Sequence, residues 1–259
     1  MKKNPPLINR GYFARVYMIR TIIQQFLNGI LSDTSNQGLQ IVLLGAGNDT
    51  LYFLLKNKVL EVSSVFEIFE LDLPEVVSKK IQCIQGSPNL HKNIGDFSCT
   101  SNYSELHGSD YHIVACDLSD TRAVENALQK ANISFSKPTL FLSECVLIYL
   151  NHQHSDSLLQ WISSSFELCS ICVYEQINPH DPFGKTMVQN LQKRGCPLLG
   201  LEKYPTLADQ KQRYSQFGWQ RVEGNDLYHI YNDVIPKEHT KRIEKIEFLD
   251  ELEEWKMIQ

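Results

Sequence analysis

Residues 40–50 read Gln-Ile-Val-Leu-Leu-Gly-Ala-Gly-Asn-Asp-Thr. Their apolar run ends abruptly in Gly45-Ala46-Gly47, and a stretch typical of a helix, residues 49–60, follows. Glycine allows backbone dihedrals that a Cβ would forbid and lets the main chain approach a ligand closely. The pattern therefore predicts a strand, a tight turn and a helix, although by itself the glycine pair indicates no more than a turn.

A second apolar run, residues 65–71, ends in Asp72, about 25 residues after the glycine turn. Nucleotide-binding folds place an acid at this distance to bind ribose. The third position of the G-x-G-x-x-G pattern is Thr50, where a glycine would let the helix pack closely beneath a pyrophosphate. The departure disfavours NAD and favours a ligand without phosphates, for which S-adenosylmethionine is the leading candidate.

Length and composition indicate one α/β domain over residues 1–259. The hydrophobic content of 42% and the charged content of 21% are those of a globular protein. A net charge of −5 lowers the expectation of a nucleic-acid ligand. The sequence has no apolar run of membrane-spanning length and no signal-peptide pattern, so a cytoplasmic protein that does not bind membranes is expected. Cys169 and Cys172 form a C-x-x-C without a second ligand pair, and no metal site is expected.

Apolar runs alternate with helical stretches along the chain, which predicts a mostly parallel sheet with helices on both faces. Strands are expected at residues 40–44, 65–71, 111–116, 138–143, 169–175 and about 218–231. Helices are expected at residues 12–31, 49–60, 74–85, 121–131, 155–167, 183–194, 206–216 and 238–257. Loops are expected around Gly86-Ser87-Pro88 and Ser101-Asn102.

Acidic or glycine residues follow four consecutive predicted strands directly, where each apolar run stops. They are Gly45 with Gly47, then Asp72, then Asp117 with Leu118, and finally Glu144. One acid in such a place is usually a helix cap. Ligands of open α/β sheets bind outside the carboxyl ends of the strands where strand order reverses, so the series predicts one binding site.

The chemistry of these residues suits S-adenosylmethionine. Asp72 can accept hydrogen bonds from both ribose hydroxyls, and Asp117 can accept from the adenine amino group while the amide of Leu118 donates to the ring. Glu144 can pair with the methionine ammonium. The methionine carboxylate then needs a cation, and Arg15 is the expected supplier.

Six motifs follow in order along the chain. They are Asn9-Arg10-Gly11-Tyr12-Phe13-Ala14-Arg15-Val16, Leu44-Gly45-Ala46-Gly47-Asn48-Asp49-Thr50, Phe69-Glu70-Leu71-Asp72-Leu73-Pro74, Ser143-Glu144-Cys145-Val146-Leu147-Ile148-Tyr149, Tyr174-Glu175-Gln176-Ile177-Asn178 and Glu247-Phe248-Leu249-Asp250-Glu251. Over nearly the whole chain, this series resembles the leucine carboxyl methyltransferases. The resemblance implies a Rossmann-like class I methyltransferase fold. It also implies methyl-esterification of the C-terminal leucine carboxylate of the protein phosphatase 2A catalytic subunit, which regulates holoenzyme assembly.

The resemblance also implies roles for individual residues. Cofactor roles fall to Arg15, Gly45, Asp72, Asp117, Leu118 and Glu144. Tyr149 resembles a residue at the substrate carboxylate, so that Tyr149 and Arg15 are the expected catalytic residues. A pocket for the substrate peptide is expected from Asp181, Phe183, Gly184 and Met187.

The implied reaction is in-line transfer of the sulfonium methyl to a carboxylate oxygen. A C-terminal carboxylate is ionised at pH 7, so the reaction needs no general base. Catalysis is expected from alignment of the two reactants and exclusion of water. Either Arg10 or Arg15 is expected to bind the substrate carboxylate, and the sequence leaves both open. Arg10 and Tyr149 also have a structural interpretation without a functional role. Arg10 is then a solvated charge, and Tyr149 is a tyrosine at the edge of the core.

The two ends depart from the family pattern. Eight residues precede the Asn-Arg-Gly-Tyr motif, which predicts a short N-terminal lid. The chain stops at residue 259, just after the last predicted helix, so a final antiparallel strand is expected to be missing and an edge of the sheet exposed. The corresponding hypothesis is a shortened form that binds S-adenosylmethionine more weakly than a full-length relative does. Separately, the protein is expected to be a monomer.

Three alternatives stay open at the level of sequence. The first is a relative that makes a carboxyl methyl ester on a hypermodified guanosine of transfer RNA. The second is an NAD-dependent oxidoreductase, disfavoured by Thr50. The third is a non-catalytic protein that binds the phosphatase.

Overall fold

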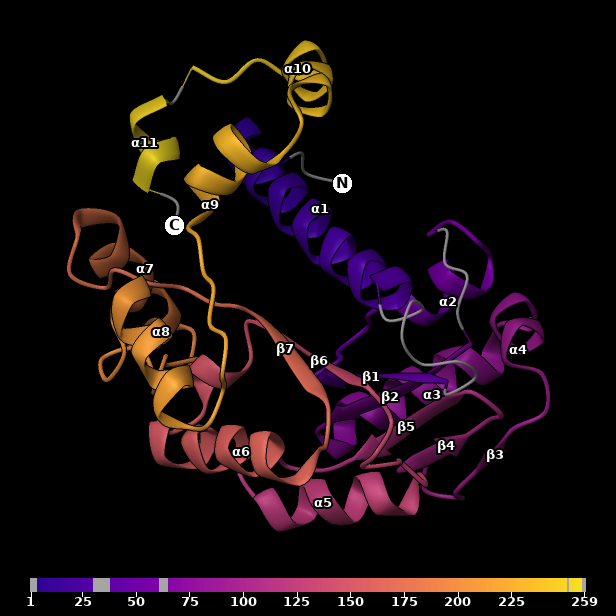
Figure 1. Ribbon diagram of the computed structural model, residues 1–259. Coiled ribbons are helices and arrows are strands. Elements are labelled where there is room, and N and C mark those ends of the chain that lie inside the picture. Colours follow the sequence, from indigo (N-terminus) through magenta and orange to yellow (C-terminus); the bar gives the residue numbers. More distant parts are fainter. Residues whose placement is uncertain (1–3, 30–37, 61–64, 251, 258–259) are drawn as a thin grey trace. The chain divides into compact units, whose positions relative to one another are not determined.

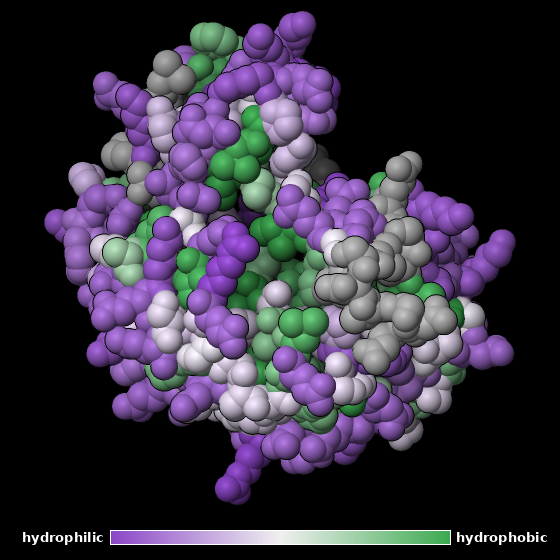
Figure 2. All heavy atoms as spheres, viewed as in Figure 1, coloured by the Kyte–Doolittle hydropathy of each residue, from purple (hydrophilic) through white to green (hydrophobic). Residues whose placement is uncertain are grey.

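The computed structural model describes residues 4–29, 38–60, 65–250 and 252–257. The chain divides into two compact units, each described by itself. The sheet unit comprises Ile23–Glu175, and the helical unit comprises Met1–Ile22 together with Gln176–Gln259. Figure 2 shows hydrophilic residues over most of the visible face. In the described ranges, no helix combines the length and the apolar character needed to cross a membrane.

A seven-stranded sheet forms the sheet unit, in the order β3-β4-β5-β2-β1-β6-β7 (Figure 1). Five parallel strands make up most of it: β1 (Leu39–Leu44), β2 (Phe66–Asp72), β5 (Tyr111–Ala115), β6 (Thr139–Glu144) and β7 (Cys169–Tyr174). β3 (Ser98–Cys99) and β4 (Glu105–His107) add an antiparallel hairpin beside β5. Strand order reverses at β1, which lies between β2 and β6, so the site is expected at its carboxyl end.

Helices cover both faces of this sheet, which confirms the predicted α/β architecture. The helices of the sheet unit are α2 (Leu51–Lys56), α3 (Pro74–Gly86), α4 (Pro88–Ile94), α5 (Thr121–Lys130), the 3-10 turn η2 (Leu147–Tyr149) and α6 (His152–Ser165). In Figure 1, α5 and α6 lie along one face. Side chains of Asp120 and Asn151 cap these two helices by accepting backbone hydrogen bonds.

The core of the sheet unit consists of the central strands. All six residues of β1 are buried, including Ile41 and Val42, because helices cover the strand on both faces. Gln40 is the polar exception, and its side chain bonds to Thr139 and to the backbone of Ser134. This pairing satisfies the buried amide and ties β1 to the segment before β6.

The helical unit is built from helices alone in the part of the chain that is described. α1 (Pro6–Gly29) begins in this unit, which also holds α7 (Pro182–Lys193), α8 (Leu207–Gln216), α9 (Leu227–His229), the π turn η3 (Ile230–Val234), α10 (Lys237–Ile246) and α11 (Leu252–Met257). A capping box of Thr206 and Asp209 starts α8.

Two predicted elements were wrong. Residues 218–231 do not form a strand: residues 220–225 have no regular structure, and Asp226 then caps α9 by accepting from the amide of His229 at 2.7 Å. The single helix expected over residues 238–257 is interrupted at residues 247–250 and forms α10 and α11. Apolar content misled the first prediction, since a capping acid decided the local structure.

Short elements were missed as well, among them η2 (Leu147–Tyr149). α4 occupies part of the expected loop after Gly86, and β3 and β4 flank the turn that was predicted at Ser101-Asn102. Strands of two and three residues carry no readable alternation, so their sequence gives little indication of them. The other predicted helices and strands agree with the structure within four residues at each end, apart from the first helix. That helix was predicted over residues 12–31, but α1 already begins at Pro6, and residues 30–31 lie outside the described residues.

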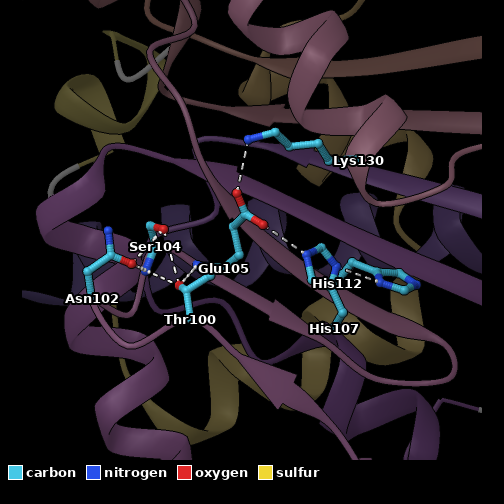
Figure 3. A network of polar contacts seen from close by, with 7 residues as sticks. All are labelled: Thr100, Asn102, Ser104, Glu105, His107, His112 and Lys130. Carbon is cyan, nitrogen blue, oxygen red and sulfur yellow. Dashed lines mark hydrogen bonds and ion pairs between the residues drawn. The ribbon is translucent and has the colours of Figure 1, made fainter.

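A cluster of polar side chains joins β4 of the antiparallel hairpin to β5 and α5 (Figure 3). The Nδ1 atoms of His107 and His112 lie 3.3 Å apart, and Glu105 pairs with His107 at 3.4 Å and with Lys130 at 3.3 Å. The ring of His112 also stacks on Phe69, with the ring centroids 4.9 Å apart. One imidazole must donate and the other accept, so the contact requires at least one neutral ring.

We expect His112 of β5, in contact with His107, to make stability fall on acidification. Burial, and then the neighbouring His107, lower the pKa of His112 from its usual 6.5. A folded-state pKa below the unfolded value means that the stabilisation is complete above pH 6.5 and is lost as pH falls through the folded-state pKa. Urea unfolding at several pH values should therefore show a smaller pH dependence for His112→Asn than for the unmodified protein. The exposed His154→Asn is the control, and an unchanged slope for His112→Asn would contradict the assignment.

Candidate functional site

The glycine turn after β1 has the predicted backbone conformation. Gly45 and Gly47 have positive φ angles of +70° and +53°, a region that favours glycine. A Cβ on Gly45 would lie 2.6 and 2.7 Å from the methyl groups of Val146, whereas one on Gly47 would meet nothing within 4 Å. Close packing against Val146 therefore requires glycine at position 45. At position 47 only the backbone conformation favours glycine.

Asp72 ends β2, and its carboxylate closes the glycine turn. One oxygen accepts a hydrogen bond from the amide of Gly47 at 2.6 Å, and the other accepts from the amide of Leu73 at 2.7 Å. Both bonds are to a charged acceptor and fix the orientation of the carboxylate. Each oxygen keeps acceptor capacity for a ligand, because an ionised carboxylate has about four lone-pair positions.

Strand register places the predicted site residues in one row. Leu44 pairs with Leu71 on one side and with Ser143 on the other. The next residues along the three strands are Gly45, Asp72 and Glu144, so the turn lies between two acids at the carboxyl edge of the sheet. Adjacent strands are about 4.8 Å apart, which puts the backbones of the two acids about 10 Å from each other.

Asp117 and Leu118 follow β5 at the same edge. The side chain of Asp117 is exposed and accepts from the amide of Ser119 at 2.8 Å, while Leu118 is buried. Burial, reinforced by the carboxylates of Asp117, Asp72 and Asp120, raises the pKa of the Cys116 thiol to about 12. The three carboxylates therefore all lie near Cys116, and their negative charge favours a cationic ligand over an anionic one nearby.

The segment after β6 carries Glu144 and Tyr149, both half-buried. Cys145 follows Glu144 with φ +56°, an uncommon conformation for a residue with a side chain, and turns the chain into η2. Glu175 accepts from the amides of Val146 and Ile148 at 3.3 and 3.0 Å and holds this turn. Glu175 was missed as a site residue, although it directly follows the apolar run of β7 as the other acids follow theirs.

Arg10 and Arg15 lie on α1, and Arg10 belongs to an aromatic cluster of the helical unit. Arg10 is 8% exposed, and its guanidinium carbon lies 5.1 Å from the ring centre of Tyr231 and 5.8 Å from that of Trp255. These contacts exclude the solvated alternative for Arg10. A cation–π contact holds a guanidinium in place and leaves its fork of N–H donors suited to a carboxylate. Arg15 is half-buried.

The predicted peptide-pocket residues gather at the start of α7 in the helical unit. Asp181 caps this helix by accepting from the amide of Gly184 at 2.6 Å. A Cβ on Gly184 would lie 2.1 Å from the carbonyl oxygen of Asn178, so the loop and the helix pack closely there. Phe183 is 37% exposed and Met187 is half-buried, so both are available for contact with a ligand. Their roles, and those of Arg10 and Arg15, stay predictions.

The residues at the carboxyl edge fit S-adenosylmethionine better than a dinucleotide. Asp72, Asp117 and Glu144 supply hydrogen-bond acceptors and negative charge, which suit ribose hydroxyls, an amino group, an ammonium and a sulfonium. A pyrophosphate in the same place would be repelled by these acids. Thr50 at the third position of the glycine pattern agrees with this conclusion.

Comparison with known proteins identifies the family. The family described as "Leucine carboxyl methyltransferase" matches residues 1–163. The Arabidopsis thaliana protein named leucine carboxyl methyltransferase 1 homolog is 38% identical over 99% of this chain and 76% of its own length. The chain belongs to the leucine carboxyl methyltransferase family. Its reaction class is accordingly S-adenosylmethionine-dependent methyl transfer to a carboxylate.

Other relatives carry two different names. Leucine carboxyl methyltransferase 1 of Bos taurus is 37% identical over 97% of this chain and 74% of its own length. The tRNA wybutosine-synthesizing protein 4 of Rattus norvegicus is 35% identical over 98% of this chain and 37% of its own length. Because the chain is similarly identical to both kinds of relative, sequence identity does not determine its substrate.

Solved methyltransferase structures are distant in sequence from this family member. The Haemonchus contortus Phospholethanolamine N-methyltransferase 2 matches with a TM-score of 0.46 and 10% identity, over 90% of this chain and 48% of its own. CalO1, a methyltransferase in calicheamicin biosynthesis, matches with a TM-score of 0.39 and 14% identity, over 79% of this chain and 50% of its own.

Proposed function

We propose that this protein transfers the methyl group of S-adenosylmethionine to the C-terminal leucine carboxylate of the protein phosphatase 2A catalytic subunit. The observation that carries the proposal is the row of Asp72, Gly45 and Glu144 at the strand-order reversal, in a member of this family. The row offers acceptors for the ribose and for the ammonium of the methyl donor.

In this proposal, the side chains of the protein bind and orient the methyl donor and the substrate carboxylate. When bound, S-adenosylmethionine supplies an electrophilic methyl group on sulfur. Asp72 and Glu144 hold the donor by its ribose and its ammonium, and Asp117 with Leu118 holds the adenine. Arg10, Arg15 and Tyr149 are assigned to the methionine and substrate carboxylates. The attacking carboxylate is ionised at neutral pH, so no side chain has to remove a proton.

Charge supports a protein substrate over transfer RNA. The chain carries 25 Lys and Arg against 30 Asp and Glu residues, a net charge of −5. Nucleic-acid binding relies on neutralisation of phosphates by basic side chains, and an acidic protein loses this attraction. We therefore assign the leucine carboxylate as the substrate and keep the modified guanosine of transfer RNA as the second candidate, because a relative with that name is 35% identical.

Transfer of a labelled methyl group tests the proposal. The protein is incubated with methyl-labelled S-adenosylmethionine and the phosphatase catalytic subunit, with a subunit that lacks the terminal leucine as control. Base-labile label that depends on the leucine is expected. Label on transfer RNA from cells that lack the esterified guanosine would favour the second candidate. Cofactor binding without label on either substrate would favour the non-catalytic binding protein.

Arg10→Lys should separate the roles of the two arginines. We expect the KM for the phosphatase subunit to rise about tenfold or more, because lysine keeps the charge and the aromatic contacts but loses the bidentate fork. The Kd for S-adenosylmethionine, measured by calorimetry, should stay the same. Arg20→Lys on the same helix is the matched control. If the cofactor Kd rises instead, then Arg10 serves the cofactor and the assignment is wrong.

A further inference from the structure

A buried ion pair joins β2 to α3 in the sheet unit, close to the glycine turn. Glu70 of β2 is 1% exposed and pairs with Lys80 of α3, which is 6% exposed. The hydroxyl of Tyr111 donates to the other carboxylate oxygen of Glu70 at 2.9 Å. Burial raises the pKa of Glu70 to about 7, and the ammonium of Lys80, followed by the Tyr111 hydroxyl, opposes that rise.

Lys80 makes a second contact, and this one reaches the cofactor turn. Its ammonium donates to the backbone carbonyl of Asp49 at 2.9 Å. The amide of Asp49 donates back to Ala46 at 2.9 Å, and its side chain accepts from the amide of Leu51 at 2.6 Å. Asp49 thus joins the end of the glycine turn to the first residue of α2.

The same turn is bound at its other end by Asp72, through the amide of Gly47. Glu70 and Asp72 are two residues apart on β2, so their side chains extend from the same face of the strand. Two residues on one face of β2 therefore hold the turn in place. Asp72 binds the Gly47 amide directly, and Glu70 pairs with Lys80, which binds the Asp49 carbonyl. Displacement of the Asp49 carbonyl would change where the Gly47 amide and the Asp72 carboxylate lie.

α2 is docked separately. Tyr52 stacks on Tyr111 with the ring centroids 4.0 Å apart, and its hydroxyl donates to Asp110 at 2.9 Å. Lys56 pairs with the same carboxylate at 2.7 Å. The helix therefore keeps strong contacts without Lys80, so loss of the lysine should act mainly on the turn that precedes the helix.

We infer that Lys80 is a positioning residue for the cofactor turn, with Glu70 as its buried counter-ion. The inference rests on the proposed use of S-adenosylmethionine. A buried ion pair adds little net stability over a neutral pair of similar volume, so stability does not account for it well. The hydrogen bond from the ammonium to the turn carbonyl, in contrast, orients backbone groups next to the ribose-binding acid.

Three variants test the inference: Lys80→Met, the double variant Lys80→Met with Glu70→Gln, and the exposed neighbour Lys79→Met as matched control. Lys80→Met leaves Glu70 without its counter-ion, and its Tm should fall by roughly 5–10 °C. The double variant is neutral at both positions, and the oxygen of the introduced glutamine can still accept from Tyr111, so its Tm should recover most of the loss. The buried NH2 group of the glutamine faces methionine and keeps the recovery below completion. Calorimetric titration with S-adenosylmethionine and amide hydrogen exchange of residues 45–51 are measured for each.

The double variant decides the outcome. We expect it to bind S-adenosylmethionine about tenfold more weakly than the unmodified protein, and its turn amides to exchange faster, even though most of its Tm has recovered. Recovery of affinity and exchange together with Tm would overturn the inference and make the pair purely structural. If the unmodified protein does not bind S-adenosylmethionine, then the proposed function fails, and hydrogen exchange at the turn still tests the role of Lys80.

Discussion

Asp72→Asn is expected to weaken S-adenosylmethionine binding by about a hundredfold or more, because hydrogen bonds from two ribose hydroxyls to a charged acceptor are lost or reduced. The effect is larger than that of an ordinary ribose contact for a structural reason. The carboxylate also accepts from the amides of Gly47 and Leu73, at 2.6 and 2.7 Å. An asparagine has one acceptor oxygen and a donating NH2 group, so one of the two amides would face a donor.

Calorimetric titration measures this loss, and thermal unfolding without ligand measures its structural part. Asp96→Asn, an exposed acid of the same unit, is the control and should change neither quantity. Both the affinity and the Tm of Asp72→Asn should fall, the affinity more strongly. An affinity within a factor of about three of the unmodified protein would remove Asp72 from the cofactor site, since that factor is smaller than one net hydrogen bond.

Gly45→Ala is expected to lower the free energy of unfolding by about 2–4 kcal/mol, through backbone strain and overpacking together. The new Cβ would sit at φ +70° and within 2.6 and 2.7 Å of the two methyl groups of Val146. These methyl groups belong to the segment after Glu144, so relief of the overlap must displace either the turn or that segment. Cofactor binding should therefore weaken as well.

Gly47→Ala separates the two causes. Its φ is +53°, but an added Cβ would meet nothing within 4 Å, so only the backbone strain of about 1–2 kcal/mol should appear. Val146→Ala in the Gly45→Ala background removes both methyl groups and should restore part of the lost stability. Chemical denaturation measures the free energy of unfolding of the unmodified protein, Gly45→Ala, Gly47→Ala and the double variant Gly45→Ala with Val146→Ala. Equal losses at the two glycines, without improvement by Val146→Ala, would show that the close contact does not limit stability.

Prediction from sequence succeeded where local chemistry decides. The parallel strands and most helices were identified, as were the residues at or just after the ends of β1, β2, β5 and β6. An apolar run followed by a glycine or an acid indicates a strand and its end. Prediction failed at residues 218–231, where Asp226 caps a short helix. It also missed Glu175, whose acceptor role depends on where the amides of η2 lie.

The local amino-acid sequence therefore accounts for the strand, turn and helix of residues 39–56. Glycine conformation and hydrophobic periodicity depend only on residues that are close together in the sequence. Contacts between residues distant in the sequence follow from strand register and helix packing instead. Register puts Asp72 and Glu144 on either side of Gly45, and helix packing brings Lys80 to Glu70 and Asp49. The aromatic contacts of Arg10 join residues more than 200 positions apart. Such contacts depend on how whole elements pack, because a buried charge is tolerated only where distant partners satisfy it.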